Sequence, residues 1–288
     1  MLPGLHATLA SLVRHLGRRE RVSLSLFVHD IKEGELASIR GTIRDAGGVG
    51  ALTVHEAGLS DFKDLKALQG DRMPYLRLHL PRLMPEADTI LYLDSDLIAN
   101  TDACALFEHK LDDFPLGAVN GPTVAWSLDR DFLKTVGLTD DDRTFNSGVL
   151  LVNAKLWRKT GLVERAMEMA RANSSILTSH DQSVLNGLFS RDFHGLAGQF
   201  NIEVTPEAGP LAVADGIYHF VGSPKPWDPC GRLFHGNWRI WNDVIRQTQF
   251  NWSDFLSHHS VAYGVRTWTL RRSYLRTLLR RMGSTLDT

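Results

Sequence analysis

The sequence is poor in several features that would each have indicated a particular class of protein. It has only two cysteines among 288 residues, which excludes a disulfide-stapled scaffold and favours a reducing compartment. No apolar run approaches the roughly 20 residues that a membrane-spanning helix needs. The start has no basic segment followed by a long apolar core, so we expect no signal peptide. Lys and Arg together number 32 against 33 for Asp and Glu, and this balance predicts no general affinity for nucleic acid.

The rest of the composition is typical of a globular protein. Hydrophobic residues make up 43% and charged residues 23% of the chain, and its length allows one large domain or two small ones. Helical spacing of apolar residues over 5–16 and 34–45 alternates with short strand patterns over 22–29 and 51–55. Such alternation predicts an α/β layered fold with a mostly parallel central sheet.

A short apolar stretch, residues 89–93, leads directly into two carboxylates, Asp94 and Asp96. Its Thr, Ile and Tyr favour a buried strand, and ligands of open α/β sheets bind just beyond strand ends. At spacing i, i+2 both carboxylates leave the strand end on the same side, so both can reach one ion. Their hard oxygens suit Mg²⁺ or Mn²⁺ shared with phosphates. The alternative is a polar turn that contains two acids and closes the strand.

Further polar residues stand beside predicted helices and strands. Arg77 lies on a short predicted helix over 73–81, where it is either a solvated surface charge or a partner for phosphate. Asn146 approaches a predicted strand over 149–152, and it is either a turn residue or a ligand for sugar hydroxyls. Gly148, next to that strand, lets the backbone pass close to a ligand.

Two later stretches allow a structural and a functional interpretation. Either Ser179 or Asp181 caps the predicted helix over 183–189, or Asp181 lies with Gln182 at the mouth of a site, facing the reacting carbon. His219 alternates with apolar residues in a predicted strand, where a lone histidine is usually a core or rim residue. Lys225 lies between two prolines, which would hold its charge in place for a phosphate.

Together, four blocks of the sequence resemble glycosyltransferase family 8, the retaining sugar transferases that include bacterial lipopolysaccharide galactosyl- and glucosyltransferases. The blocks occur in the family's order within about residues 5–245. They are Tyr75-x-Arg77 with Leu91-Tyr92-Leu93-Asp94-Ser95-Asp96, Phe145-Asn146-Ser147-Gly148-Val149-Leu150-Leu151-Val152-Asn153, His180-Asp181-Gln182 with Leu185-Asn186, and His219-Phe220-x-Gly222-x-x-Lys225-Pro226-Trp227. The resemblance implies a nucleotide-sugar-binding α/β domain of the type called GT-A.

The resemblance also implies a role for individual residues. Asp94, Asp96 and His219 would hold a divalent ion, Mn²⁺ in preference to Mg²⁺ because imidazole is a softer ligand than oxygen. Gly222 and Lys225 would contact the diphosphate of a UDP-sugar. Arg77, Ser95 and Ser147 would bind the donor. Asn146, Asp181 and Gln182 would surround the donor sugar, and these three would be the catalytic residues.

The implied activity is transfer of glucose or galactose from a UDP-sugar to a cell-surface glycan or lipopolysaccharide, with retention of configuration. The metal ion and Lys225 would stabilise the departing diphosphate. Retention requires either a carboxylate nucleophile or same-face attack guided by the leaving phosphate, and Asp181 and the amide of Gln182 are the candidate groups. Two other functions fit less of the sequence: a catalytically impaired relative that binds sugar nucleotides or acts as a scaffold, and a metal-dependent phosphohydrolase.

The two ends of the chain depart from the family pattern. Residues 5–16 resemble the helix that follows the family's first strand, so we expect that inner strand to be missing, with unpaired ladder groups and an apolar slot in its place. An upstream start codon or a loss of donor binding would each account for this. We expect a transferase domain over 1–245 and a helical, basic extension over 246–288. Its arginines alternate with apolar residues, so it either lies on an anionic membrane surface, on the cytoplasmic side near a glycolipid acceptor, or packs on its own domain.

Overall fold

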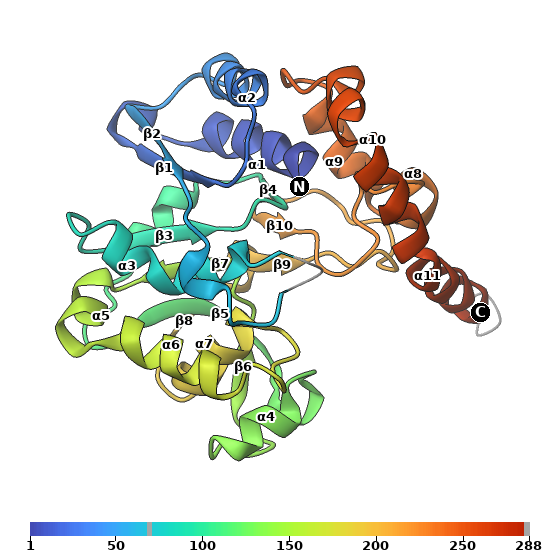
Figure 1. The fold of residues 1–288 in the computed structure, drawn as a ribbon. Helices are drawn as coiled ribbons and strands as arrows, with labels where there is room; N and C mark the ends of the chain where they lie inside the picture. The colour runs from blue at the N-terminus through green and yellow to red at the C-terminus, as the bar shows by residue number, and fades with distance from the viewer. Residues whose placement is uncertain (68–70, 285–288) are drawn as a thin grey trace.

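The structure is a computed structural model that describes residues 1–67 and 71–284, without the side chains of 280–284. Figure 1 shows strands and helices in alternation, with the N-terminal elements at the top of the view, a central sheet in the middle and the C-terminal helices along one side. The predicted α/β class is therefore confirmed.

The N-terminal part of the chain folds as a two-stranded parallel sheet with two helices. Its elements are α1 (Leu2–His15), β1 (Ser23–Val28), α2 (Glu33–Asp45) and β2 (Ala51–Glu56). The two strands pair from Ser23 opposite Ala51 to Val28 opposite Glu56. Apolar side chains of both helices and both strands form one buried cluster, because each helix turns an apolar stripe toward the strands.

The central sheet is mixed, which corrects the prediction of a mostly parallel sheet. In spatial order its strands are β3 (Ile90–Leu93), β7 (Val149–Val152), β5 (Leu116–Thr123) and β6 (Arg143–Phe145), and β8 (His194–Leu196) also pairs with β5. β7 is antiparallel to β3 and β5, and β5 is antiparallel to β6 but parallel to β8. Every residue of β7 is buried. A buried apolar run identifies an inner strand but carries no information about its direction.

A smaller three-stranded sheet continues from the central one. Its strands are β4 (Leu97–Ala99), β9 (Ile202–Glu203) and β10 (Ile217–His219). β10 lies between the other two, antiparallel to β4 and parallel to β9. In this register His219 is opposite Leu97, the residue that follows the acidic turn at the end of β3. The pairing of β4 with β10 therefore brings the histidine to the two acids.

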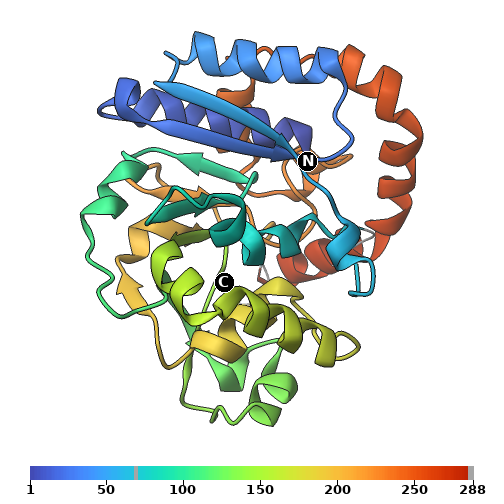
Figure 2. The ribbon, with the colours of Figure 1, turned by 60° about the vertical axis from the view of Figure 1, so that its left-hand side comes forward.

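Helices from the middle of the chain pack against the central sheet, as the turned view in Figure 2 shows. The predicted helix over 73–81 is present as a 3₁₀ helix, Met73–His79, that continues into α3 (Leu80–Leu83). The other helices are α4 (Arg130–Thr135), α5 (Ala154–Thr160), α6 (Leu162–Ala172) and α7 (Asp181–Phe189). Short 3₁₀ turns occupy Arg19–Arg21, Ser60–Phe62, Ala103–Glu108, Val124–Trp126 and Gly198–Asn201. Trp157 is fully buried and packs on the ring of Phe189, 5.4 Å between centroids.

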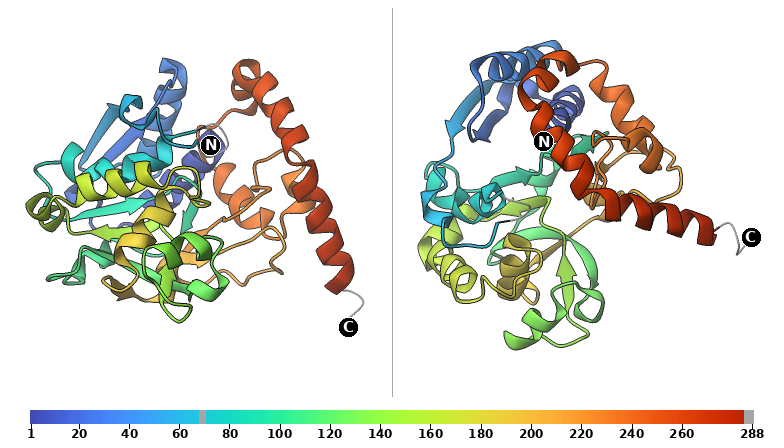
Figure 3. Two further views of the ribbon diagram at one scale, coloured as in Figure 1. Left: turned by 60° about the horizontal axis from the view of Figure 1, so that its bottom comes forward. Right: turned by 45° about the vertical axis from the view of Figure 1, so that its right-hand side comes forward.

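The C-terminal part of the described chain is helical. Its elements are α8 (Gly231–Phe234), α9 (Trp238–Ile245), α10 (Trp252–Thr269) and α11 (Arg271–Ser284). α9 packs against α1, and the rings of Trp227 and Trp241 lie 5.8 Å apart in the cluster that they share. Figure 3 shows α11 extending away from the rest of the molecule. Within the described ranges, no helix has the length and apolar content required to cross a membrane.

The hydrogen-bonded ladder is interrupted between the N-terminal strands and the central sheet. Among the described residues, β1 hydrogen-bonds to β2 alone and β3 to β7 alone. Leu24, Leu91 and Leu93 on these two strands are partly buried, and they pack against one buried cluster that contains Leu12 and Leu97. Apolar side chains of both strands thus pack against shared core residues.

Candidate functional site

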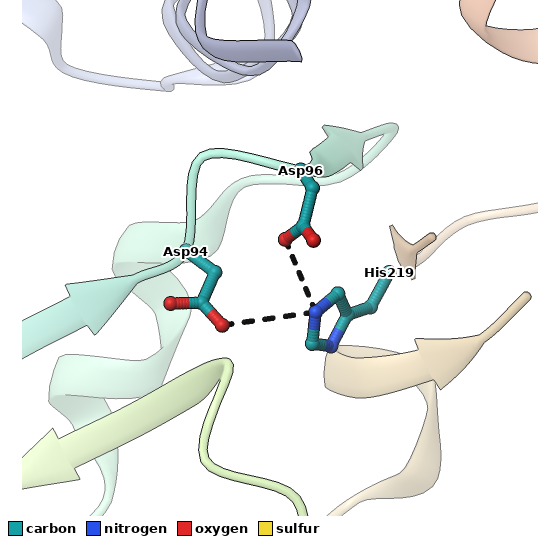
Figure 4. A group of neighbouring side chains, drawn as sticks. All are labelled: Asp94, Asp96 and His219. Atoms are coloured by element: carbon teal, nitrogen blue, oxygen red, sulfur yellow. Dashed lines mark ion pairs between the residues drawn. The ribbon is translucent and has the colours of Figure 1, made fainter. Parts of the chain in front are cut away.

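The acidic turn between β3 and β4 is the centre of the candidate site. Figure 4 shows Asp94 and Asp96 turned toward the ring of His219. The Nε2 atom of His219 lies 3.1 Å from Asp96 Oδ1 and 3.7 Å from Asp94 Oδ2. One ligand atom from each of the three residues lies within 4.8 Å of the others, which is close enough for all three to bind one ion. The structure therefore brings together the three residues that the resemblance assigns to the metal.

A chain of amides fixes the orientation of the histidine ring. His219 Nδ1 lies 3.0 Å from Asn201 Oδ1, and Asn201 Nδ2 donates to Asn146 Oδ1 at 3.1 Å. Because an amide oxygen only accepts, Nδ1 carries the proton and Nε2 faces the acids. Asn146 Oδ1 also accepts the N–H of Gly148 at 2.8 Å. A Cβ atom on Gly148 would lie 2.2 Å from His219 Cε1, so this position requires glycine.

The donor atoms of this cluster fit a divalent cation. Asp96 Oδ1 is buried, and no described residue gives it a hydrogen bond. With the proton of His219 on Nδ1, the lone pair of Nε2 points at that oxygen. Two acceptor atoms this close repel each other unless a proton or a cation lies between them. Two carboxylates and one imidazole are ligands that first-row divalent metals accept.

Lys225 lies on the other side of Asp96. It belongs to the loop after β10, and its Nζ donates to Asp96 Oδ2 at 2.7 Å and also to the carbonyl of Phe220. Burial acts to raise the pKa of Asp96, but Lys225 and His219 outweigh burial and hold that pKa below its ordinary value. Gly222 precedes the lysine in the same loop and has a left-handed φ of 73°. The two oxygens of Asp96 thus face different groups, Oδ2 the ammonium of Lys225 and Oδ1 the ring of His219.

Arg77 connects three of the four sequence blocks from a buried position. Its Nη2 donates to Asp94 Oδ1 at 2.8 Å, and its Nε lies 2.9 Å from Asp181 Oδ2. Its Nη1 donates to the carbonyl oxygen of Ser147 at 2.7 Å and to Oγ at 2.6 Å. Burial acts to lower the pKa of Arg77, but Asp181 and Asp94 outweigh it and raise that pKa. The guanidinium is therefore a permanent charge that holds two acids in place.

Asp181 does not cap its own helix. The N-cap residue of α7 is His180, which makes no side-chain capping bond and has a φ of 55°. The carboxylate of Asp181 is buried and faces Arg77. Burial raises the pKa of Asp181 to about 6, although the charge of Arg77 opposes this shift. The capping interpretation is thus wrong for Asp181, and the acid lies with the other polar residues of the site.

The segment before β7 is fastened to α7 by amide side chains. Gln182 Oε1 accepts the N–H of Ser147 at 3.1 Å. Asn186 bonds both backbone groups of Phe145, accepting from the N–H at 2.8 Å and donating to the carbonyl at 2.9 Å. Ser95 lies half-buried between the two acids of the turn. All four sequence blocks therefore meet in one region.

Three residues of this region were not identified from the sequence. Tyr92 donates its hydroxyl to Asp94 Oδ1 at 2.5 Å, and its ring lies under the guanidinium of Arg77, 4.5 Å from the centroid. Its spacing of two residues from Asp94 was the available signal, because i and i+2 share one face of a strand. Asn201 gave no local signal. Asp228 accepts the backbone N–H of Lys225 at 2.7 Å, three residues along the same loop.

Comparison with solved structures defines the class of fold. A structure of the galactosyltransferase LgtC, in complex with donor and acceptor sugar analogs, superposes with a TM-score of 0.73 at 21% sequence identity, over 89% of this chain and 95% of that one. The glycosyltransferase GlyE of Streptococcus pneumoniae superposes with a TM-score of 0.61 at 24% identity, over 91% of this chain and 61% of that one. These likenesses establish the fold as GT-A.

The sequence itself then gives the family. Residues 2–230 match the model of Glycosyl transferase family 8, and the chain belongs to that family. Among curated proteins, GlyE of Streptococcus pneumoniae is 26% identical over 263 residues, covering 84% of this chain and 60% of GlyE. A putative glycosyltransferase of Haemophilus influenzae is 23% identical over 60% of this chain and 53% of its own length. The chain thus spans little more than half the length of these relatives.

Proposed function

We propose that this protein is a metal-dependent retaining hexosyltransferase that moves glucose or galactose from a UDP-sugar to a glycan or lipopolysaccharide acceptor. The observation that carries the proposal is the convergence of Asp94, Asp96 and His219 beside Lys225. Membership of family 8 supports sugar transfer, and the fold is shared with LgtC, whose structure was determined with donor and acceptor sugar analogs.

We propose that Asp94, Asp96 and His219 hold Mn²⁺, with Mg²⁺ as the alternative. The imidazole favours Mn²⁺, because Mg²⁺ prefers an all-oxygen set of ligands. When bound, the ion would act as a Lewis acid on the diphosphate leaving group. Arg77 and the amide chain that ends at His219 hold the three ligand side chains in place without the ion. These side chains therefore lose little conformational freedom when the ion binds.

Phosphate contacts are assigned to Gly222 and Lys225. Lys225 Nζ is a compact charge, and Asp96 fixes it close to the metal ligands. It can therefore stabilise negative charge on the diphosphate as the bond to the anomeric carbon breaks. Gly222 allows the loop its left-handed turn next to that lysine. Arg77 would act on the donor mainly by orienting Asp94 and Asp181, because its donor groups already face protein oxygens.

The donor sugar is assigned to Ser95, Asn146, Ser147, Asp181 and Gln182. Two routes to retention stay open for this constellation. Asp181 is buried against Arg77, so attack by its carboxylate requires that ion pair to loosen. Gln182 has its oxygen engaged by the Ser147 N–H, which leaves its amide N–H₂ to donate to a sugar hydroxyl. Same-face attack by the acceptor, guided by the leaving phosphate, requires no rearrangement of Asp181.

Replacement of a proposed metal ligand tests the function. We expect Asp94→Asn to lower the turnover of UDP-glucose or UDP-galactose at least ~100-fold, because one charged ligand of the ion is lost. UDP release is measured with Mn²⁺, with Mg²⁺ and with EDTA, and Asp141→Asn, an exposed acid, is the control. Wild-type turnover in Asp94→Asn would refute the metal assignment. Hydrolysis of the donor without acceptor separates an active enzyme from an impaired relative, because an active site transfers some sugar to water.

The helical extension over 246–288 is proposed to contact an anionic membrane that carries a glycolipid acceptor. Val265, Trp268 and Leu275 are exposed large apolar residues on α10 and α11, and Arg271 and Arg272 are exposed beside them. This combination suits a surface of anionic headgroups over acyl chains. The inner side of the same helices packs on the domain, so the membrane contact is proposed for the outer face alone.

Liposome binding of the full chain tests the membrane proposal. We expect the double change of Arg271 and Arg272 to Glu to abolish co-sedimentation with vesicles that contain anionic lipid. The matched control changes two arginines of the N-terminal part, Arg18 and Arg21, which are also exposed. Equal loss in both double variants would indicate net charge alone, and unchanged binding in the first would refute the contact.

A further inference from the structure

The loop that carries Lys225 is organised by a buried carboxylate. Asp228 is 7% exposed, and its Oδ2 accepts the backbone N–H of Lys225 at 2.7 Å. Its own N–H donates to the Lys225 carbonyl at 3.1 Å, and its carbonyl accepts from Gly231 at 2.8 Å. Asp228 therefore ties both backbone groups of Lys225 to the start of α8. The position of the lysine side chain beside Asp96 depends on this backbone.

The charge of Asp228 is neutralised from the C-terminal helix α10. Arg266 Nε lies 2.9 Å from Asp228 Oδ1, and Nη2 lies 3.0 Å from Oδ2, so the contact uses both oxygens. Arg266 Nη2 also lies 3.4 Å from the hydroxyl of Ser223, at the other end of the loop. A planar guanidinium that meets a carboxylate with two bonds fixes both direction and distance. Arg266 thus holds the loop at two points.

Neighbouring contacts fasten α10 and α11 to the same loop. The hydroxyl of Tyr263 donates to the Trp227 carbonyl at 3.1 Å, and the hydroxyl of Tyr274 donates to the Pro229 carbonyl. By contrast, α10 has no fully buried residue over its whole length. Besides ring contacts such as that of Trp252 with Trp241, its attachment uses polar contacts, and several of these end on the loop from Gly222 to Gly231.

We propose that Arg266 is a positioning residue for Lys225, acting through Asp228. The proposal rests on the assignment of Lys225 to the donor diphosphate. Without the guanidinium, Asp228 would be a buried carboxylate that lacks its charged partner. It would then turn toward water and release the Lys225 N–H, so the lysine would be held less firmly next to Asp96. The C-terminal helix would in this way set the affinity for the nucleotide-sugar without touching it.

The test compares Arg266→Gln with Arg271→Gln in the full chain. Arg271, at the start of α11, stacks on Trp268 at 4.1 Å, so it provides the same change of charge away from the loop. Hydrogen exchange of the peptide over 222–231 is measured first, without any ligand. We expect exchange there to be at least ~10-fold faster in Arg266→Gln, because the Lys225 N–H loses its fixed acceptor, and unchanged in Arg271→Gln. Exchange in β7 should be unchanged in both variants.

The second readout is the kinetics with a UDP-sugar and Mn²⁺. We expect the KM for the donor to rise roughly 10-fold in Arg266→Gln with kcat within about 3-fold of wild type, because binding and not chemistry is weakened. Arg266→Lys keeps the charge but offers one contact, so it should give intermediate values, and it replaces the glutamine variant if that one does not fold. Adding Asp228→Asn to Arg266→Gln should change little, since the pair is already broken.

The outcomes separate this inference from the proposed function. Unchanged exchange over 222–231 in Arg266→Gln, or an equal change in Arg271→Gln, would overturn the positioning role whatever the activity. Faster exchange with an unchanged KM would overturn the link from Arg266 to donor binding. If the wild-type chain turned over no UDP-sugar, the proposed function would fail, and the exchange experiment would still decide whether Arg266 orders the loop.

Discussion

Removing the hydroxyl of Tyr92 tests whether Asp94 must be held in place to bind a metal. The Tyr92 hydroxyl and Arg77 Nη2 both donate to Asp94 Oδ1, at 2.5 and 2.8 Å, while Oδ2 faces His219. Burial raises the pKa of Tyr92 well above its ordinary value, so the phenol stays protonated and remains a donor. Tyr92→Phe deletes that donor but keeps the ring that lies under Arg77.

The size of the effect follows from the kind of bond that is lost. A hydrogen bond to a charged group contributes about 1.5–3 kcal/mol, and the second donor from Arg77 remains. We therefore expect the free energy of unfolding without metal to fall by about 1–2 kcal/mol. Asp94 would then turn more freely, and removal of such a supporting bond typically weakens metal binding 10–100-fold. We expect the Kd for Mn²⁺ to rise roughly 10-fold, which corresponds to about 1.4 kcal/mol.

Calorimetric titration with Mn²⁺, combined with urea unfolding, measures both quantities. Tyr75→Phe is the matched control, because Tyr75 is fully buried nearby and no described residue accepts a hydrogen bond from its hydroxyl or donates one to it. Its loss should leave the Mn²⁺ affinity unchanged and stability equal or slightly higher. An Mn²⁺ affinity in Tyr92→Phe equal to that of the wild type would refute the reasoning, since Asp94 would then bind the ion without the support of the phenol.

Two further predictions concern other parts of the chain. Burial lowers the pKa of His6 from 6.5 to about 4, so the unfolded state takes up this proton first and stability is lost as pH falls from 6.5 toward 4. Between about pH 7 and about pH 5, His6 should lower the free energy of unfolding by about 2 kcal/mol. In urea unfolding, His6→Gln should therefore lose about 2 kcal/mol less stability over this pH range than the wild type. The same pH profile in both proteins would contradict the prediction. Gly148→Ala should weaken Mn²⁺ binding at least ~10-fold, because the added Cβ would lie 2.2 Å from His219 Cε1. Gly198→Ala, where a Cβ meets no atom within 4 Å, should bind Mn²⁺ as wild type does, and equal affinities in the two variants would rule out the steric argument.

Local features of this protein could be predicted from the residues alone. The run before Asp94 identified a strand that ends in acids, because side chains at i and i+2 share one side of a strand. Alternating helix and strand patterns identified the α/β class. The glycine before β7 predicted a close approach to a ligand, and in the structure the group that lies close to it is the ring of His219. The order of the four blocks identified the family. Each of these inferences depends on residues that are neighbours along the chain.

Tertiary structure alone decided which distant groups meet and in which direction the strands run. A buried apolar run such as β7 has the same composition in a parallel and an antiparallel sheet, so the mixed sheet could not be read from it. The bond from Asn201 that turns His219 Nε2 toward the acids depends on the pairing of β9 with β10. The contact of Arg266 with Asp228 depends on how α10 packs against the loop. Long-range contacts of this kind follow from register and packing, and these are properties of the folded chain as a whole.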